Sequence, residues 1–96
     1  MLAKELKKEI KTVLSTRPES FAGSRIETAA FEKSLDDIAE KAFRAGASGR
    51  LMQAISEVGN VISWLEGVRP NSKDYIDLKR EFEAAAEDAL EFLAIE

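Results

Sequence analysis

Hydrophobic side chains recur every three or four residues over most of this chain, and glycine, proline and serine separate four stretches with that spacing. This period places apolar side chains on one face of a helix. The pattern predicts helices over about 2–15, 25–45, 49–66 and 72–94, with a loop over 16–23. No stretch alternates polar and apolar residues as a strand does. The sequence therefore predicts an all-α fold.

Residues with a preference for helix ends stand at the predicted boundaries. Ser24, Ser48 and Ser72 precede three of the helices and are suited to cap their N-termini. Gly46 suits the left-handed conformation that follows a helix, and Gly67 ends the third helix. Short connections make consecutive helices antiparallel neighbours. We therefore expect a compact antiparallel four-helix bundle, formed by one domain over residues 1–96, in which the first and last helices lie side by side.

Composition narrows the chemistry that the chain can perform. It has no histidine and no cysteine, while 33% of its residues are charged and its net charge is −4. These absences exclude disulfides, thiolate and imidazole nucleophile pairs, and the usual zinc sites. No apolar run approaches the roughly 20 residues that span a bilayer, and no signal peptide is visible. We expect a cytoplasmic protein with no membrane contact, no cofactor, no metal and no enzymatic activity.

The only tryptophan is predicted on a surface that faces water. A rotation of about 100° per residue places Trp64 between Gln53 and Asn60, on the polar side of its helix. Tryptophan is enriched at interface hot spots. Three readings remain open: a partner or self-association surface, a small-molecule pocket, and a side chain folded over the 16–23 loop. The predicted partner-binding patch consists of Glu57, Val61, Trp64 and Val68.

A ridge of carboxylates runs along the last predicted helix, opposite its apolar stripe. It consists of Asp74, Asp77, Glu81 and Asp88. Carboxylates with this spacing bind cations or act as acid and base only where burial or a loop fixes their geometry. The ridge is therefore either a solvated face or a surface that recognises a basic protein partner.

Gly59 lies inside the third predicted helix, on a strip of small residues with Ser56 and Ser63. Glycine inside a helix costs about 1 kcal/mol relative to alanine. We expect another helix to approach closely there, from within the bundle or from a second copy of the chain.

The junction KAFRAGASGRLMQAI resembles a helix-turn-helix in its spacing of small, turn-forming and apolar residues. Its second helix would present Ser48, Arg50 and Gln53 to a nucleic acid. The domain is acidic, however, whereas DNA binding draws on clustered lysine and arginine. The acidic composition therefore argues against nucleic acid as a partner.

The leading functional hypothesis is a small acidic interaction module with no chemistry of its own. Inhibitors, immunity or antitoxin-like factors, adaptors and assembly subunits belong to this class. A homodimer is also expected, because Phe92 and Ile95 fall off the main core face of the last helix. The alternative is a nucleic-acid-binding regulator that uses the helix-turn-helix-like corner at 38–56.

Overall fold

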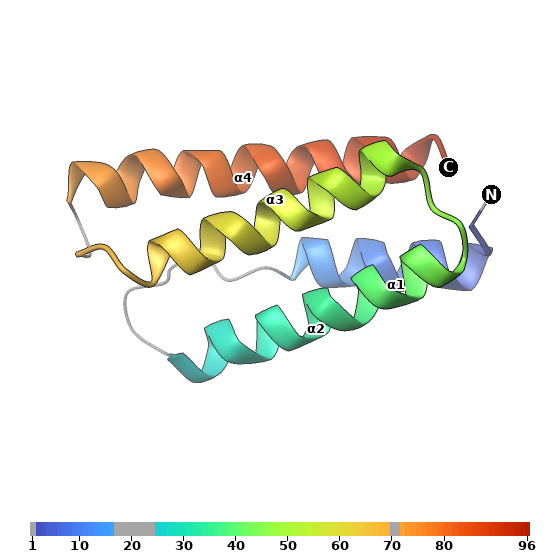
Figure 1. The fold of residues 1–96 in the computed structure, drawn as a ribbon, viewed down its shortest axis with the longest axis horizontal. Helices are drawn as coiled ribbons and strands as arrows, with labels where there is room; N and C mark the ends of the chain where they lie inside the picture. Colours follow the sequence, from blue (N-terminus) through green and yellow to red (C-terminus); the bar gives the residue numbers. More distant parts are fainter. Residues whose placement is uncertain (1, 17–24, 70–71) are drawn as a thin grey trace.

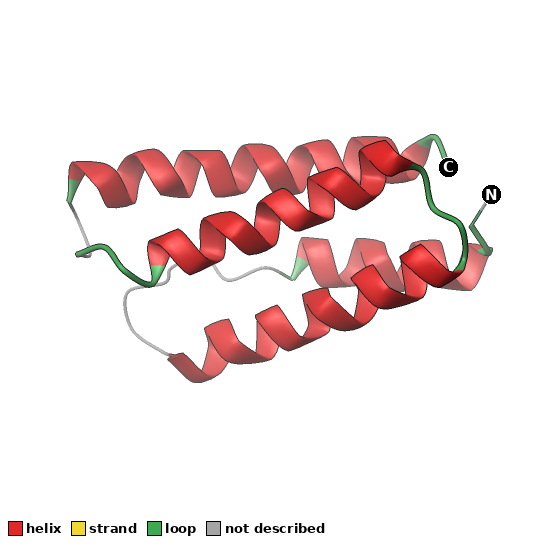
Figure 2. Cartoon of the chain, viewed as in Figure 1, coloured by secondary structure: helices red, strands yellow, loops and turns green. Residues whose placement is uncertain are grey.

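The structure, a computed structural model, describes residues 2–16, 25–69 and 72–96, with residues 25–27 as backbone only. These ranges contain four helices and no strand (Figure 2). The helices are α1 (Lys4–Ser15), α2 (Arg25–Arg44), α3 (Gly49–Leu65) and α4 (Lys73–Ala94). The predicted all-α fold is confirmed, and each described helix boundary lies within two residues of its predicted position.

Each helix runs opposite to the one before it, as Figure 1 shows. α3 and α4 pack against each other most extensively, and α1 contacts both α2 and α4. The first and last helices therefore close the bundle, as predicted. The molecule measures 41 × 22 × 17 Å. The α2–α3 turn lies at the same end of the bundle as the C-terminus.

The predicted capping residues stabilise the helix ends that the structure describes. Gly46 adopts the left-handed conformation with φ of 79°, and the side chain of Ser48 accepts a hydrogen bond from the Leu51 N–H at 3.3 Å. The side chain of Ser72 likewise accepts from the Tyr75 N–H at 3.1 Å. The predicted cap Ser24 and the predicted loop beyond residue 16 lie outside the described residues.

The C-terminal residue ties α4 to the α2–α3 turn. The backbone N–H of Ser48 donates a hydrogen bond to Oε1 of Glu96 at 2.8 Å. Hydrogen bonding from the side chain of Ser48, together with this backbone bond, favours the ionised carboxylate and lowers the pKa of Glu96 from its usual value. Helical periodicity carried no signal for this contact, because the two residues are 48 positions apart.

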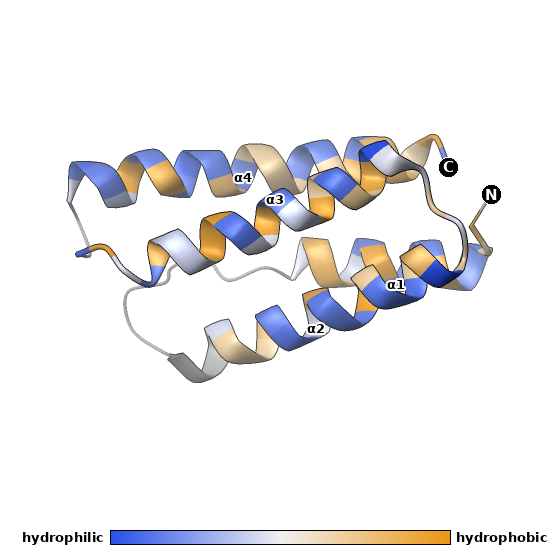
Figure 3. Cartoon of the chain, viewed as in Figure 1, coloured by the Kyte–Doolittle hydropathy of each residue, from blue (hydrophilic) through white to orange (hydrophobic). Residues whose placement is uncertain are grey.

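The core runs the length of the bundle, and every helix contributes its apolar stripe to it. Apolar and polar stretches alternate along the helices in Figure 3, as one-sided burial requires. Phe82 is fully buried and meets Phe31 of α2 edge to face, with ring centroids 6.0 Å apart. The largest fully buried side chains are Ile10, Leu14, Ile38, Leu51, Val58, Val61, Ile62 and Phe82.

Gly59 faces α2 of the same chain. Of the two expected neighbours, a helix of the bundle or a second copy of the chain, the structure shows the first. A Cβ atom built on Gly59 would lie 3.8 Å from Cδ2 of Leu35. This is an ordinary van der Waals distance, so the two helices leave room for a methyl group. Close approach of α2 therefore does not by itself require glycine at this position.

Candidate partner-binding site

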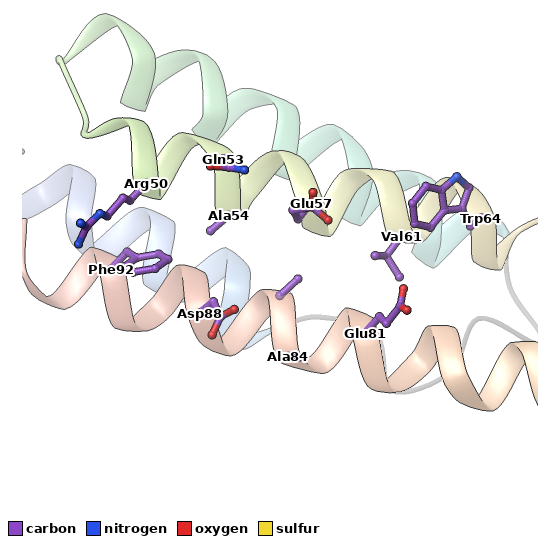
Figure 4. Close-up of a pocket in the computed structure, with 11 residues that line it drawn as sticks. Arg50, Gln53, Ala54, Glu57, Val61, Trp64, Glu81, Ala84, Asp88 and Phe92 are labelled. Atoms are coloured by element: carbon purple, nitrogen blue, oxygen red, sulfur yellow. The ribbon is translucent and has the colours of Figure 1, made fainter.

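A groove of about 800 Å³ lies between α3 and α4. Figure 4 shows Arg50 and Phe92 at one end of it and Trp64 at the other. Its apolar surface comes from residues Ala54, Val61, Ala84, Ala85 and Phe92. Its polar border comes from Arg50, Gln53, Glu57, Glu81 and Asp88. The groove therefore has an apolar floor between charged edges.

Trp64 is exposed, as its helical rotation predicts. Its exposed fraction is 54%, although large apolar side chains of the same helix are buried in the core. The side chain lines the α3–α4 groove and also a neighbouring pocket with Asp74, Asp77 and Val68. The alternative is that Trp64 covers the 16–23 loop. It involves residues 17–23, which lie outside the described residues.

Val61 is buried, although the sequence predicted it in an exposed partner-binding patch. It is only 2% exposed and belongs to the core. Residue 61 shares the buried face of α3 with Val58 and Leu65, three residues before it and four after it. Val61 thus contributes to the groove floor, and Val68, which is half-buried, lies in the neighbouring pocket.

The structure brings the acidic ridge of α4 to the same surface as Trp64. Glu81 and Asp88 border the groove, while Asp74 and Asp77 line the neighbouring pocket that shares Trp64. All four carboxylates are exposed. With Glu57 of α3, five carboxylates and the single cation Arg50 line these two described pockets. In the sequence the tryptophan and the ridge lie on separate predicted helices, and no pattern places them on one surface.

A second polar site lies on the opposite side of α3, where Glu32 of α2 meets Glu66 at the end of α3. Oε1 of Glu32 is buried, and no donor among the described residues bonds to it. A hydrogen bond between the two carboxyl groups requires a proton on one of them. This bond with Glu66, together with burial and the charges of Glu66 and Asp36, raises the pKa of Glu32 from 4.5 to about 7.

Sequence reasoning missed this carboxyl pair. Its one local signal is that Glu32 lies four residues after Thr28, which is buried, and directly after the core residue Phe31. That position marks the edge of the buried face of α2, where a charged group is partly desolvated. The partner, Glu66, lies 34 positions along the chain, and nothing in the sequence pairs the two.

The helix-turn-helix-like corner forms part of the bundle. Ser48 caps α3, and Arg50 and Gln53 line the groove beside α4. Helix-turn-helix motifs cross their helices at about 90–120°, whereas α2 and α3 run antiparallel here (Figure 1). The structure therefore places Arg50 and Gln53 in the acidic α3–α4 groove, and Ser48 at the α2–α3 turn beside Glu96.

Comparisons of the chain with protein-family models, with curated proteins and with solved structures gave no match. None of the described helices has the length and apolar character needed to cross a membrane. In the described ranges, no group of three or more acidic side chains is arranged to hold a metal ion.

Proposed function

We propose that this protein is a non-enzymatic interaction module whose α3–α4 groove binds a basic segment of a partner protein. The observation that carries this proposal is the half-exposed indole of Trp64 beside an apolar floor, between carboxylates on both helices. Apolar anchors surrounded by polar residues are typical of protein interfaces. The partner's apolar side chains contact the floor, and its lysine or arginine side chains pair with the carboxylates.

Charge distinguishes this occupant from a second copy of the chain. A symmetric dimer through the groove places Glu81 and Asp88 of one copy near the same residues of the other, so like charges oppose each other. A basic partner gains attraction from the same carboxylates. Their field also speeds the encounter with a cationic partner at low salt.

Self-association, which the sequence predicts, has separate support from two other large apolar side chains that are exposed. Phe43 near the end of α2 is 74% exposed and Ile95 after α4 is 75% exposed. Both belong to the end of the bundle where the α2–α3 turn and the C-terminus lie. Phe92, also expected to favour a dimer, instead lines the groove and is half-buried against the core. A dimer through Phe43 and Ile95 leaves Trp64 available to a partner.

Capture of the partner from cells of the native host tests the proposed function. We expect one basic protein to bind the wild-type chain. Trp64→Ala or Asp88→Lys should lower the amount captured about tenfold or more, as for interface hot spots. Ile76→Ala is the matched control for an exposed large apolar residue, and Glu91→Lys is the matched control for an exposed α4 carboxylate outside the groove. Capture that survives both groove variants, or that falls equally in the controls, would refute the proposal.

A further inference from the structure

The backbone of the groove walls dictates what kind of segment fits between them. α3 and α4 are continuous helices, so their N–H and C=O groups in the groove are already bonded within each helix. An extended peptide needs an unpaired strand edge to satisfy its own backbone groups. A helical peptide satisfies these groups internally and presents only side chains to an apolar floor. The groove therefore favours a helix over an extended segment.

The dimensions and floor of the groove also suit a helix. Its α3 wall runs from Arg50 to Trp64, which at 1.5 Å per residue is about 21 Å, or about four helical turns. Ala54, Ala84 and Ala85 occupy the floor, and small side chains allow the axis of a third helix to come close. The larger rings of Phe92 and Trp64 lie towards the two ends (Figure 4).

The charges are unequal at the two ends of the groove. Arg50 lies at one end, whereas Glu81 lies towards the Trp64 end and Asp74 and Asp77 line the adjoining pocket. A helix carries partial positive charge at its N-terminus and partial negative charge at its C-terminus. A bound helix is therefore more stable with its N-terminus near Trp64 and its C-terminus near Arg50.

We infer that the α3–α4 groove binds one amphipathic basic helix of about four turns, with its N-terminus at the Trp64 end and its C-terminus at the Arg50 end. The helix lies parallel to α4 and antiparallel to α3. Its apolar residues recur at helical spacing, and lysine or arginine residues border them on both sides. This inference rests on the proposed function and specifies the partner segment of the same site.

Synthetic peptides of about 15 residues, with both ends blocked, test the inference directly. The first peptide has leucines at i, i+4, i+7 and i+11 with lysines bordering them. The second has the same composition but alternates leucine with polar residues, which suits an extended segment. The third replaces the lysines of the first with glutamates. Each is titrated into the full ¹⁵N-labelled protein and followed by chemical-shift changes and by calorimetry.

We expect the helical lysine peptide to bind at least about tenfold more tightly than either matched peptide, with shift changes confined to the groove. Trp64→Ala and Asp88→Lys should each weaken it about tenfold, while Glu91→Lys changes its affinity less than about twofold. A nitroxide on the peptide's N-terminus should broaden amides near Trp64 and Asp77. One on its C-terminus should broaden those near Arg50 and Phe92.

Equal or tighter binding of the alternating peptide would overturn the helical occupant, and so would absence of binding by the helical peptide. Equal binding of the glutamate peptide would overturn the basic character, and reversed nitroxide broadening would overturn the orientation. Groove shifts that depend on protein concentration in the free protein would show a second copy in the groove and overturn the inference.

The host capture experiment separates the two failures. Where Trp64→Ala and Asp88→Lys abolish capture of the host protein but the helical peptide shows no preference, the helical occupant is wrong and the proposed function stands. Where capture is insensitive to both variants, the proposed function is wrong whatever the peptides do.

Discussion

Replacing Glu32 with glutamine should remove a pH dependence of stability that the wild-type bundle has. The carboxyl group of Glu32 lies against that of Glu66 and is partly shielded from water, and the pKa of Glu32 is raised to about 7. In the unfolded chain the same group titrates near its ordinary value of 4.5. Between these two values the folded state binds a proton that the unfolded state has released. Stability should therefore fall as pH rises through this window.

The size of the effect follows from the two pKa values. Each unit of difference corresponds to 1.36 kcal/mol, so a rise from 4.5 to about 7 is worth about 3 kcal/mol as an upper bound. Glu66 is exposed, and water around it screens part of the repulsion. We expect the free energy of unfolding to fall by about 1–2 kcal/mol between about pH 5 and pH 8. Glu32→Gln should be flat there and more stable than wild type at pH 8.

Urea unfolding followed by circular dichroism at several pH values and constant ionic strength measures this directly. This pH window separates the pair from two other described groups whose pKa values are shifted. The pKa of Glu96 is lowered, so its contribution is lost only at more acidic pH, and the pKa of Lys41 is raised by Glu9, so it titrates at alkaline pH. Glu91→Gln, at an exposed site on α4, is the control and should keep the wild-type slope.

Two results would refute the reasoning about the carboxyl pair. The first is a wild-type protein whose stability rises or stays constant between about pH 5 and pH 8. The second is a Glu32→Gln variant with the same slope as the wild type. Glu66→Gln provides a further check, because it removes the opposing charge and should flatten the slope as well.

Three other predictions concern single substitutions measured by urea unfolding. Trp64→Ala should lower the free energy of unfolding by no more than about 1.5 kcal/mol, because Trp64 is 54% exposed. Phe82→Ala, at a fully buried site, should lower it by about 3–5 kcal/mol. Equal losses would place Trp64 in the core. Gly59→Ala should stabilise by about 0.5–1 kcal/mol, since its new methyl lies 3.8 Å from Leu35, and a loss would show that α2 packs more tightly. Gly46→Ala should destabilise by about 1 kcal/mol because of its positive φ, and a neutral result would contradict the left-handed turn.

Light scattering tests self-association. Exposed Phe43 and Ile95 should give a mass above 10.6 kDa at high micromolar concentration, and the combined change of both residues to serine should restore the monomer mass. A wild-type mass of 10.6 kDa at that concentration would contradict the expected dimer.

Most of the fold was predictable because local rules agree with one another. Apolar periodicity and the caps at Ser48 and Ser72 define the helices, and Gly46 defines the turn between α2 and α3. The N-terminus shows where local rules end. Leu2 is buried although α1 begins at Lys4, because extended chain before the helix still reaches the core.

The candidate site was predictable only one helix at a time. The helical rotation along α3 correctly predicted that Trp64 is exposed. The spacing along α4 correctly predicted that the acidic ridge is exposed. Their meeting in one surface depends on how α3 is rotated and shifted against α4, which no pattern within either helix encodes. The pairing of Glu32 with Glu66 has the same origin, since it depends on the register between α2 and the end of α3.

The order of the helices has a consequence for folding. Each helix packs on its neighbour in sequence, while the α1–α4 contact, the Phe31–Phe82 ring pair and the Ser48–Glu96 hydrogen bond join distant parts of the chain. Such local topologies fold fast, since little loop entropy is lost before contacts form. α3 and α4 form the most extensive contact and contribute every residue that lines the groove. The groove thus belongs to one contiguous hairpin, and we expect the amides of α3 and α4 to exchange with solvent more slowly than those of α1.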